Sequence, residues 1–326
     1  MWKRLISCAL FFAGVAAAAV TPSIASAQTT IKIGDLRADS MIRLYYADKK
    51  GYFAAEGLKP ELVTLGSGPA VASAVASGSV DIGYAGIIPV IFARARNQPF
   101  VIVDTLDYEY GAAGKQDVWI VASKSSNIHT LADSRGKTIA INATGAICEL
   151  LVKDHLAKAG VPYDAVKKII VPMPQMGSML QVGNADAACI SEPFYAAAKM
   201  SPAIQAVTLA SGVVADLPAD QRIALDVLFA RADWVQQHKD VLQRFNRVLA
   251  RASADFRANP DLYQQWLVSE FKLTPELAHQ VTHYFDWGDL TPDAASLRPL
   301  INSMTRNGLL HEPLDANSLV ADVNAK

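Results

Sequence analysis

Two stretches of the chain repeat the same order of residue types: residues 77–83 (SGSVDIG) and residues 182–188 (VGNADAA). Each is typical of a helix end, a glycine turn, an aspartate and a short apolar strand that leads to a proline loop. Upstream, residues 31–58 and 138–161 also match in outline, with a strand, a polar loop and an amphipathic helix. Two similar α/β halves in one chain form a cleft into which strand ends and helix starts point.

Short β-type runs alternate with helical patterns over the first two thirds of the chain. This alternation predicts an α/β fold with parallel sheets covered by helices. The expected strands are 31–34, 62–65, 80–84, 101–104, 119–122, 138–142, 168–172 and 187–190, and the expected helices are 40–50, 69–77, 89–95, 145–159 and 176–182.

After Asp233 the pattern changes, and apolar residues recur at helical spacing. The last third is therefore expected to be mainly helical and to pack onto a sheet. The apolar positions of its longest predicted helix are Val241, Leu242, Phe245, Val248, Leu249, Ala252 and Phe256.

The first 27 residues are typical of a secretory signal peptide. Lys3 and Arg4 precede an apolar run at 5–20, and small residues at 25–27 favour cleavage after Ala27. A transmembrane anchor is the alternative, but the run is shorter than the ~20 residues that span a bilayer. We therefore expect a periplasmic protein.

Composition narrows the class of protein further. The 326 residues are 51% hydrophobic with a formal charge of −1, which suits two globular domains and excludes nucleic acid as an expected partner. Beyond the leader only Cys148 and Cys189 remain, with neither the number of a disulfide framework nor the spacing of zinc ligands. In an oxidising compartment the two could pair, and two separate buried thiols are equally consistent with the sequence.

Four stretches resemble the solute-binding proteins of the alkanesulfonate, taurine and nitrate importers, a family that includes binders of thiamine precursors. They are 50–58 (KGYFAAEGL), 76–83 (ASGSVDIG), 128–140 (IHTLADSRGKTIA) and 186–194 (DAACISEPF). The resemblance implies a type II periplasmic-binding-protein fold with one discontinuous lobe. Lobe one would take residues 28–111 and 220–326, and lobe two residues 112–219, with the two crossings acting as a hinge.

Two helix starts are the candidate anion-binding elements, because helix N-termini present unpaired N–H groups and partial positive charge. Ser67 and Gly68 open a helix in the first half, and Thr144 and Gly145 open one in the second. The alternative is that Ser67 and Thr144 act only as N-caps.

Four further residues are candidate ligand contacts. Arg37 follows the first strand, where the family contributes a contact, and its guanidinium could clamp a sulfonate or carboxylate. Tyr84 lies at the end of the expected strand 80–84, Tyr108 follows the expected strand 101–104, and the two could form an aromatic wall. Glu192 lies in the loop that marks the family's cleft. An exposed arginine, structural tyrosines and a loop-anchoring glutamate are the respective alternatives.

Asp107 and Glu109 make the predicted loop before the hinge acidic, which counts against a purely anionic ligand. We therefore rank organic sulfonates or carboxylates first, zwitterions second and inorganic anions third.

The chain contains no phosphate-binding glycine loop and no protease or esterase motif. His279 and His283 have helical i, i+4 spacing, but a solvated or partner-facing pair is favoured over a metal site. No catalytic residue, metal or cofactor is expected. The resemblance implies a monomer that passes a small-molecule ligand to an ABC permease; a sensory binding protein and a secreted enzyme are the alternatives.

Overall fold

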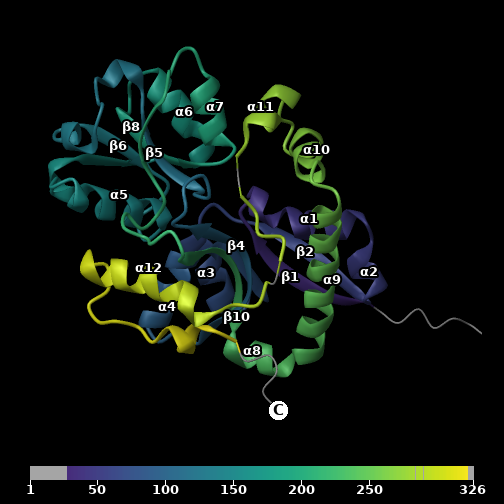
Figure 1. The fold of residues 1–326 in the computed structure, drawn as a ribbon. Helices are drawn as coiled ribbons and strands as arrows, with labels where there is room; N and C mark the ends of the chain where they lie inside the picture. The colour runs from purple at the N-terminus through teal and green to yellow at the C-terminus, as the bar shows by residue number, and fades with distance from the viewer. Residues whose placement is uncertain (1–27, 283, 289, 322–326) are drawn as a thin grey trace, which may run out of the picture.

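The computed structural model describes residues 28–282, 284–288 and 290–321. The chain forms two α/β lobes, each built around a five-stranded sheet (Figure 1). The sheet with strand order β2-β1-β3-β10-β4 defines lobe one, and the sheet with order β7-β6-β8-β5-β9 defines lobe two. The predicted signal peptide, residues 1–27, lies outside the described residues.

Lobe one draws on both ends of the chain. Its strands are β1 (Thr29–Asp35), β2 (Leu58–Thr64), β3 (Ile82–Gly86), β4 (Phe100–Tyr110) and β10 (Arg222–Arg231). The helices between these strands are α1 (Ile42–Lys49), α2 (Tyr52–Ala55), α3 (Gly68–Ser77) and α4 (Ile87–Ala95), with a 3-10 turn η1 (Asp39–Met41) before α1. After β10 come α8 (Ala232–Gln237), α9 (Lys239–Ala258), α10 (Leu262–Ser269), α11 (Pro275–Gln280), α12 (Ala294–Arg306) and η5 (Ala316–Leu319).

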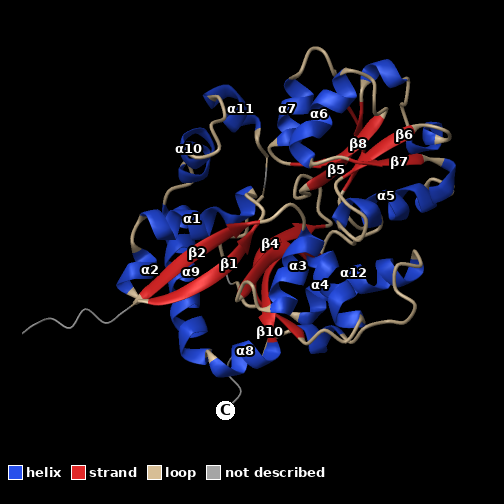
Figure 2. Ribbon diagram, turned by 180° about the vertical axis from the view of Figure 1, so that it is seen from behind, coloured by secondary structure: helices blue, strands red, loops and turns tan. Residues whose placement is uncertain are grey.

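Lobe two is a single continuous segment whose strands form a separate sheet (Figure 2). Its strands are β5 (Val118–Ala122), β6 (Thr138–Ile141), β7 (Lys167–Ile170), β8 (Ala187–Ser191) and β9 (Val207–Ser211). Its helices are α5 (Ile147–Lys158), α6 (Met173–Gln181) and α7 (Phe194–Met200), with 3-10 turns η2 (Lys124–Ser126), η3 (Leu131–Ser134) and η4 (Tyr163–Ala165). Every strand expected from the sequence is present, with ends shifted by a few residues, whereas β9 and β10 were not predicted.

The internal repeat corresponds to the same hydrogen-bonded turn in both lobes. Asp81 accepts a hydrogen bond from the Lys32 amide through Oδ2 at 2.8 Å and returns one from its own amide to the Lys32 carbonyl at 2.8 Å. Asp186 makes the same pair of bonds with Thr138, at 2.8 and 2.9 Å. The aspartate therefore fixes the strand that follows it, β3 against β1 in lobe one and β8 against β6 in lobe two.

β10 returns the chain to the first sheet after lobe two is complete. It lies between β3 and β4 and runs antiparallel to both. Because β4 pairs with β10 along its length, β4 continues beyond its predicted end at Asp104 as far as Tyr110. Asp107 and Glu109 are consequently buried strand residues, and their predicted placement in an acidic loop was wrong.

The two segments that connect the lobes run side by side. The Gly111 amide donates to the Gln221 carbonyl at 3.0 Å. A Cβ atom at Gly111 would lie 2.2 Å from the Pro218 carbonyl oxygen, so this close approach requires glycine.

One buried carboxylate joins both connections. Glu109, at the end of β4, accepts hydrogen bonds from the Val213 amide at 2.6 Å and from the Asp117 amide at 3.2 Å. Burial raises the pKa of Glu109 to about 7, although these two N–H groups oppose the shift. Both connections between the lobes are therefore held by one buried carboxyl group.

The two remaining cysteines are paired in the core of lobe two. Cys148 on α5 and Cys189 on β8 form a disulfide whose Cα atoms are 5.6 Å apart. The bond fastens the helix to the sheet and closes a loop with a sequence separation of 41. Pairing, which the sequence left open, is the outcome in the structure.

The C-terminal third is mainly helical, as predicted. All seven apolar positions expected on one face of α9 are buried, and α9 packs beside α1 (Figure 1). None of the helices in the described ranges is both long and apolar enough to cross a bilayer.

A fully buried arginine fastens this C-terminal segment to lobe one. Arg43 on α1 donates to the Ser253 hydroxyl at 3.1 Å, to the Asp286 carbonyl at 2.9 Å and to the Leu106 carbonyl. Its guanidinium also lies 4.5 Å from the ring centre of Trp287. Burial lowers the pKa of Arg43 to about 10, and the group still remains protonated at neutral pH.

If the two repeated turns are equivalent, replacing either aspartate should lower the free energy of unfolding by a similar amount. We expect Asp81→Ala and Asp186→Ala each to lower the free energy of unfolding by about 1 kcal/mol, because the amide of Lys32 or Thr138 loses a charged acceptor. Urea denaturation measures the effect, with exposed Asp164→Ala as the control. A loss in one variant alone would show that the two turns are not equivalent.

Reduction of the Cys148–Cys189 bond is expected to lower the free energy of unfolding by about 2–4 kcal/mol, because the unfolded chain regains the freedom of the closed loop. Melting curves with and without dithiothreitol measure the change. The Cys148→Ala/Cys189→Ala double variant should melt at the lower temperature in both buffers; a wild-type curve unmoved by reduction would contradict the role of the bond.

The raised pKa of Glu109 predicts a pH dependence of stability. Between its ordinary value of 4.5 and about 7 the folded chain keeps a proton that the unfolded chain has released. This contribution is therefore present at low pH and is lost as the pH rises through about 7. Glu109→Gln should show a flatter curve of unfolding free energy between pH 5 and 8 than the wild type; parallel curves would exclude Glu109 as the source.

Candidate ligand-binding cleft

A hollow of about 440 Å³ lies between the two lobes. This volume is in the range of small-molecule binding sites. Its lining comes from both lobes. Lobe one contributes residues 36–39, 65–68, Tyr84, Gly86, Pro89, Leu225, Asp226, Phe271 and Leu273, and lobe two contributes Asp117, Val118, Asn142, Ala146, Ile147, 172–174 and 191–194.

The start of α3 forms part of the lobe-one wall. Ser67 is the N-cap of this helix, and its hydroxyl accepts the Ala70 amide at 3.4 Å. A Cβ atom on Gly68 would lie 2.8 Å from Pro89 Cγ, so the glycine allows the loop to pack closely on α4. Ser67 and Gly68 therefore combine the capping role with a position on the cleft.

The corresponding start of α5 differs from the prediction. Thr144 is exposed and does not cap α5; the N-cap is Ala146, and neither Thr144 nor Gly145 lines the cleft. The Gly145 amide donates to Glu149 Oε2 at 2.7 Å. The cleft instead meets the start of α5 at Ala146, its N-cap, and at Ile147, its first residue.

Arg37 lies at the edge of the cleft and is exposed to solvent. Its backbone is left-handed, with φ of 56°, and its amide donates to Asp35 Oδ1 at 2.8 Å. This bond offsets the cost of the conformation and fixes the loop after β1. Arg37 is the one cationic residue among the described residues that line the cleft.

The two predicted tyrosines have different positions. Tyr84 lines the cleft, but it is 2% exposed and its hydroxyl lies 2.5 Å from Ser40 Oγ, so it is mainly a structural residue. Tyr108 does not line the cleft. Because β4 is longer than expected, Tyr108 is buried in the strand, where its hydroxyl donates to the Thr291 carbonyl at 3.3 Å and Arg222 lies over its ring.

Glu192 lies in the cleft and also connects lobe two to the C-terminal segment. Its Oε1 accepts the amide and the hydroxyl of Thr282, each at 3.0 Å, and its Oε2 accepts the Ala196 amide at 3.1 Å. Burial raises the pKa of Glu192, and the two amides oppose the shift. α11 also packs against α7 beside this contact (Figure 1).

Several lining residues were missed from the sequence. Three of them are acidic: Asp39 before α1, Asp117 before β5 and Asp226 on β10. Asn142 also lines the cleft, and its side-chain oxygen is buried without a hydrogen-bond partner in the described part of the chain. Its position at the end of the predicted strand 138–142 was the available signal, whereas Asp226 lies on the strand that was not predicted.

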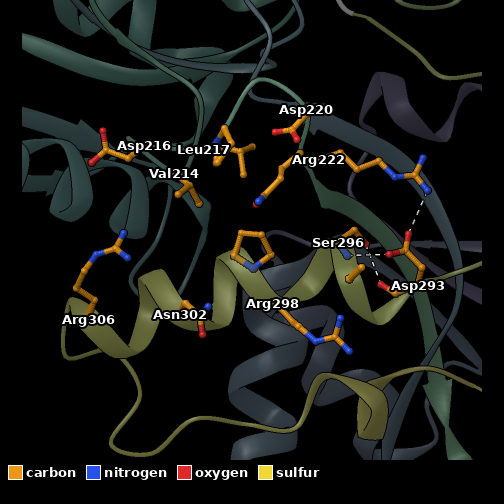
Figure 3. A pocket seen from close by; sticks show the side chains of 14 residues that line it. Val214, Asp216, Leu217, Asp220, Arg222, Asp293, Ser296, Arg298, Asn302 and Arg306 are labelled. Atoms are coloured by element: carbon orange, nitrogen blue, oxygen red, sulfur yellow. Dashed lines mark hydrogen bonds and ion pairs between the residues drawn. The ribbon is translucent and has the colours of Figure 1, made fainter.

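A larger hollow of about 800 Å³ lies between the second connection and α12 (Figure 3). It is lined by residues 214–222 in part and by one side of α12. Two of its arginines are already paired: Arg222 with Asp293 at 3.1 Å, and Arg306 with Asp154 of α5 at 3.0 Å. Its lining therefore comes from the second connection between the lobes and from α12.

In the described residues there is no group of three His, Cys, Asp or Glu side chains placed to hold a metal ion. His279 lies on α11, and His283 falls outside the described residues.

Comparison with known proteins agrees with this architecture. The family model described as NMT1/THI5 like matches residues 39–262, which is more than half of the chain. The chain belongs to the NMT1/THI5-like family. This family member has the fold of periplasmic binding proteins, as its structural neighbours do.

Three relatives illustrate the range of the family. An alkanesulfonate-binding protein from Xanthomonas axonopodis pv. citri, bound to MOPS, superposes with a TM-score of 0.73 at 20% identity, covering 91% of this chain and 98% of that one. A putative aliphatic sulfonates-binding protein of Escherichia coli (strain K12) is 30% identical over 139 residues, 43% of this chain and 42% of that protein. A 4-amino-5-hydroxymethyl-2-methylpyrimidine phosphate synthase of Aspergillus parasiticus is 40% identical over 63 residues, 19% of this chain and 18% of the synthase. The matched segments thus span less than half of each of these two curated relatives.

Proposed function

We propose that this protein is the extracytoplasmic solute-binding component of an ABC importer and captures a small organic solute in the cleft between its lobes. The observation that carries the proposal is the cleft itself, since one hollow of about 440 Å³ receives residues from both lobes next to a two-stranded hinge. Lobes joined in this way can close around a solute by a hinge motion.

The cellular setting proposed here follows from three features. The leader pattern at 1–27 favours export with cleavage after Ala27. The buried disulfide is of a kind that persists in oxidising compartments such as the periplasm. Relatives described as periplasmic or ABC-type binding proteins support an ABC permease of the inner membrane as the partner of a monomeric chain.

A binding role is supported over catalysis by the groups in the cleft. The carboxylate of Glu192 is held by Thr282 and Ala196, and Tyr84 is hydrogen-bonded to Ser40. A paired nucleophile and base is not present among the described lining residues. The partial match to a pyrimidine phosphate synthase makes turnover the control measurement, and any bound compound should be recovered unchanged.

Gly66 offers a direct test of the cleft. It lines the hollow, and a Cβ atom there would meet no heavy atom within 4 Å. Gly66→Trp should therefore fold with a nearly unchanged melting temperature and fill the site, while Gly66→Ala leaves room for a solute.

The measurement is a thermal-shift screen with small amines, sulfonates, carboxylates and neutral compounds, because solutes that bind only the folded state raise its melting temperature. The wild type and Gly66→Ala should respond to the same compounds, and Gly66→Trp should lose at least about 100-fold in affinity. If no compound stabilises the wild type at high concentration, or if Gly66→Trp binds as well as Gly66→Ala, the cleft is not a solute site.

A further inference from the structure

One part of the cleft lining comes from the C-terminal helical segment and not from the loops of either sheet. α10 and α11 follow α9 of lobe one, and α11 reaches lobe two, where it lies beside α7 (Figure 1). We call residues 262–282 the arm. The turn between its two helices contributes Phe271 and Leu273 to the lining. The arm therefore places two apolar side chains on the cleft.

The arm is fastened at both ends. On lobe one, the Tyr263 hydroxyl donates to Asp39 Oδ2 at 2.6 Å. On lobe two, the amide and the hydroxyl of Thr282 donate to Glu192 Oε1, each at 3.0 Å. Buried residues of α7 and α11 also belong to one apolar cluster. The middle of the arm is thus held in place relative to both lobes.

The turn between α10 and α11 has a defined backbone. The Leu273 amide donates to the Leu267 carbonyl of α10 at 3.2 Å, and Thr274 then caps α11 through its side chain. Lys272 is left-handed, with φ of 61°, and exposed, whereas Phe271 and Leu273 on either side of it are partly buried. The turn therefore directs its charged residue to solvent and its two apolar residues to the cleft.

Phe271 is supported by a neighbouring helix. Its ring centre lies 6.5 Å from that of Tyr45 on α1, and the Tyr45 hydroxyl donates to the buried Asp35. A solute that pressed on the Phe271 ring would therefore have to disturb this packing. Such a side chain can limit the length of a solute.

Apolar side chains of both lobes line the same cleft. Leu36 and Leu65 come from lobe one, and Met173 and Phe194 come from lobe two. Like the two arm residues, all four are only partly buried, so a solute in the cleft would remove apolar surface from water. A lining of this kind favours a solute with a carbon framework.

From these contacts we infer that Phe271 and Leu273 are specificity-determining residues, which contact the hydrocarbon part of the solute and limit its length. The inference rests on the proposed function and adds the class of solute: an organic compound whose apolar part ends against the arm. Because Phe271 and Leu273 are the arm's only contribution to the described lining, the arm selects by size and not by charge.

The experiment uses three series of straight-chain probes on the exported full-length chain: 1-alkanesulfonates, 1-alkylamines and 1-alkanols with two to eight carbon atoms. Titration calorimetry measures Kd for each probe. In any series whose head group binds, Kd should fall about threefold to fourfold for each added CH₂ group, because each buries further apolar surface. Beyond an optimum length Kd should rise again, because the next carbon atom meets Phe271 or Leu273.

Three variants of the turn test the limit. Phe271→Ala and Leu273→Ala remove volume from the lining, so each should move the optimum to chains longer by about one carbon atom or more. Leu273→Phe adds volume and should move the optimum to shorter chains. Phe271→Leu repeats the first test with a smaller change if Phe271→Ala does not fold.

Leu277→Ala is the matched control. Leu277 lies on α11 of the same arm and packs against the same apolar cluster, but it does not line the cleft. Loss of its side chain should lower the melting temperature of the free protein and leave the optimum length unchanged. A merely structural role of Phe271 would likewise weaken all chain lengths alike, so the position of the optimum separates the two roles.

The outcomes separate this inference from the proposed function. An optimum that moves with the size of residues 271 and 273 supports both. A Kd that is independent of chain length, or the same optimum in the wild type and in every variant, overturns the inference and leaves solute binding intact.

An equal shift in Leu277→Ala would assign the effect to the position of the whole arm and would also overturn the inference. The same holds if none of the alkyl probes binds while other compounds of the thermal-shift screen do. If no compound of either set binds the wild type, the proposed function fails and the inference falls with it.

Discussion

The structure depends on the way in which the chain passes twice between its lobes. β4 leads out of the first sheet and β10 leads back into it, and the two strands pair up to Tyr110 and Arg222. The connections beyond them must therefore lie in contact, which is possible because Gly111 has no side chain to meet Pro218. Glu109 then holds both connections with one carboxylate. Both covalent connections to lobe two thus pass through one place, and the Glu192–Thr282 and Arg306–Asp154 contacts join the lobes elsewhere.

Much of this fold was predictable because local residue patterns carry it. Asp81 and Asp186 follow glycine turns at matching places in the two halves, and each makes the same pair of backbone bonds. β10 escaped prediction because its sequence RIALDVLFAR has no regular polar alternation; most of its residues are buried on both faces. The last residues of β4 are a strand because they pair with β10. Without β10, the sequence placed Tyr108 in a loop and made it a candidate ligand contact. When the length of a strand depends on pairing with a distant strand, the residues of the first strand alone do not indicate where it ends.

The candidate site was predictable in location more than in charge. Ser67, Gly68 and Glu192 lie on the cleft because strand ends and helix starts in this topology face the gap between lobes. Asp117, Asp226 and Phe271 could not be placed there, since the connections and the C-terminal segment reach the cleft only through tertiary packing. The hydrogen bond from the Gly145 amide to Glu149 was also not predictable. A glutamate in the first turn of a helix can bind a backbone amide of that turn or point to solvent, and the sequence does not distinguish the two. The resemblance therefore indicated where the cleft lies but not these lining residues.

The contact between Glu192 and Thr282 has a consequence for kinetics. It joins the loop after β8 to the segment after α11, and it lies at the edge of the cleft where α7 and α11 pack together. A solute could enter by this edge only after the contact between the two segments has opened. The observed binding rate would then reach a plateau at high solute concentration, set by the rate at which the contact opens. At low concentration the second-order rate constant for association would remain well below the diffusion limit of roughly 10⁹ M⁻¹s⁻¹. On the proposed function, the same contact would also slow the release of a bound solute, so that the residence time would exceed the value expected for an open cleft of equal affinity.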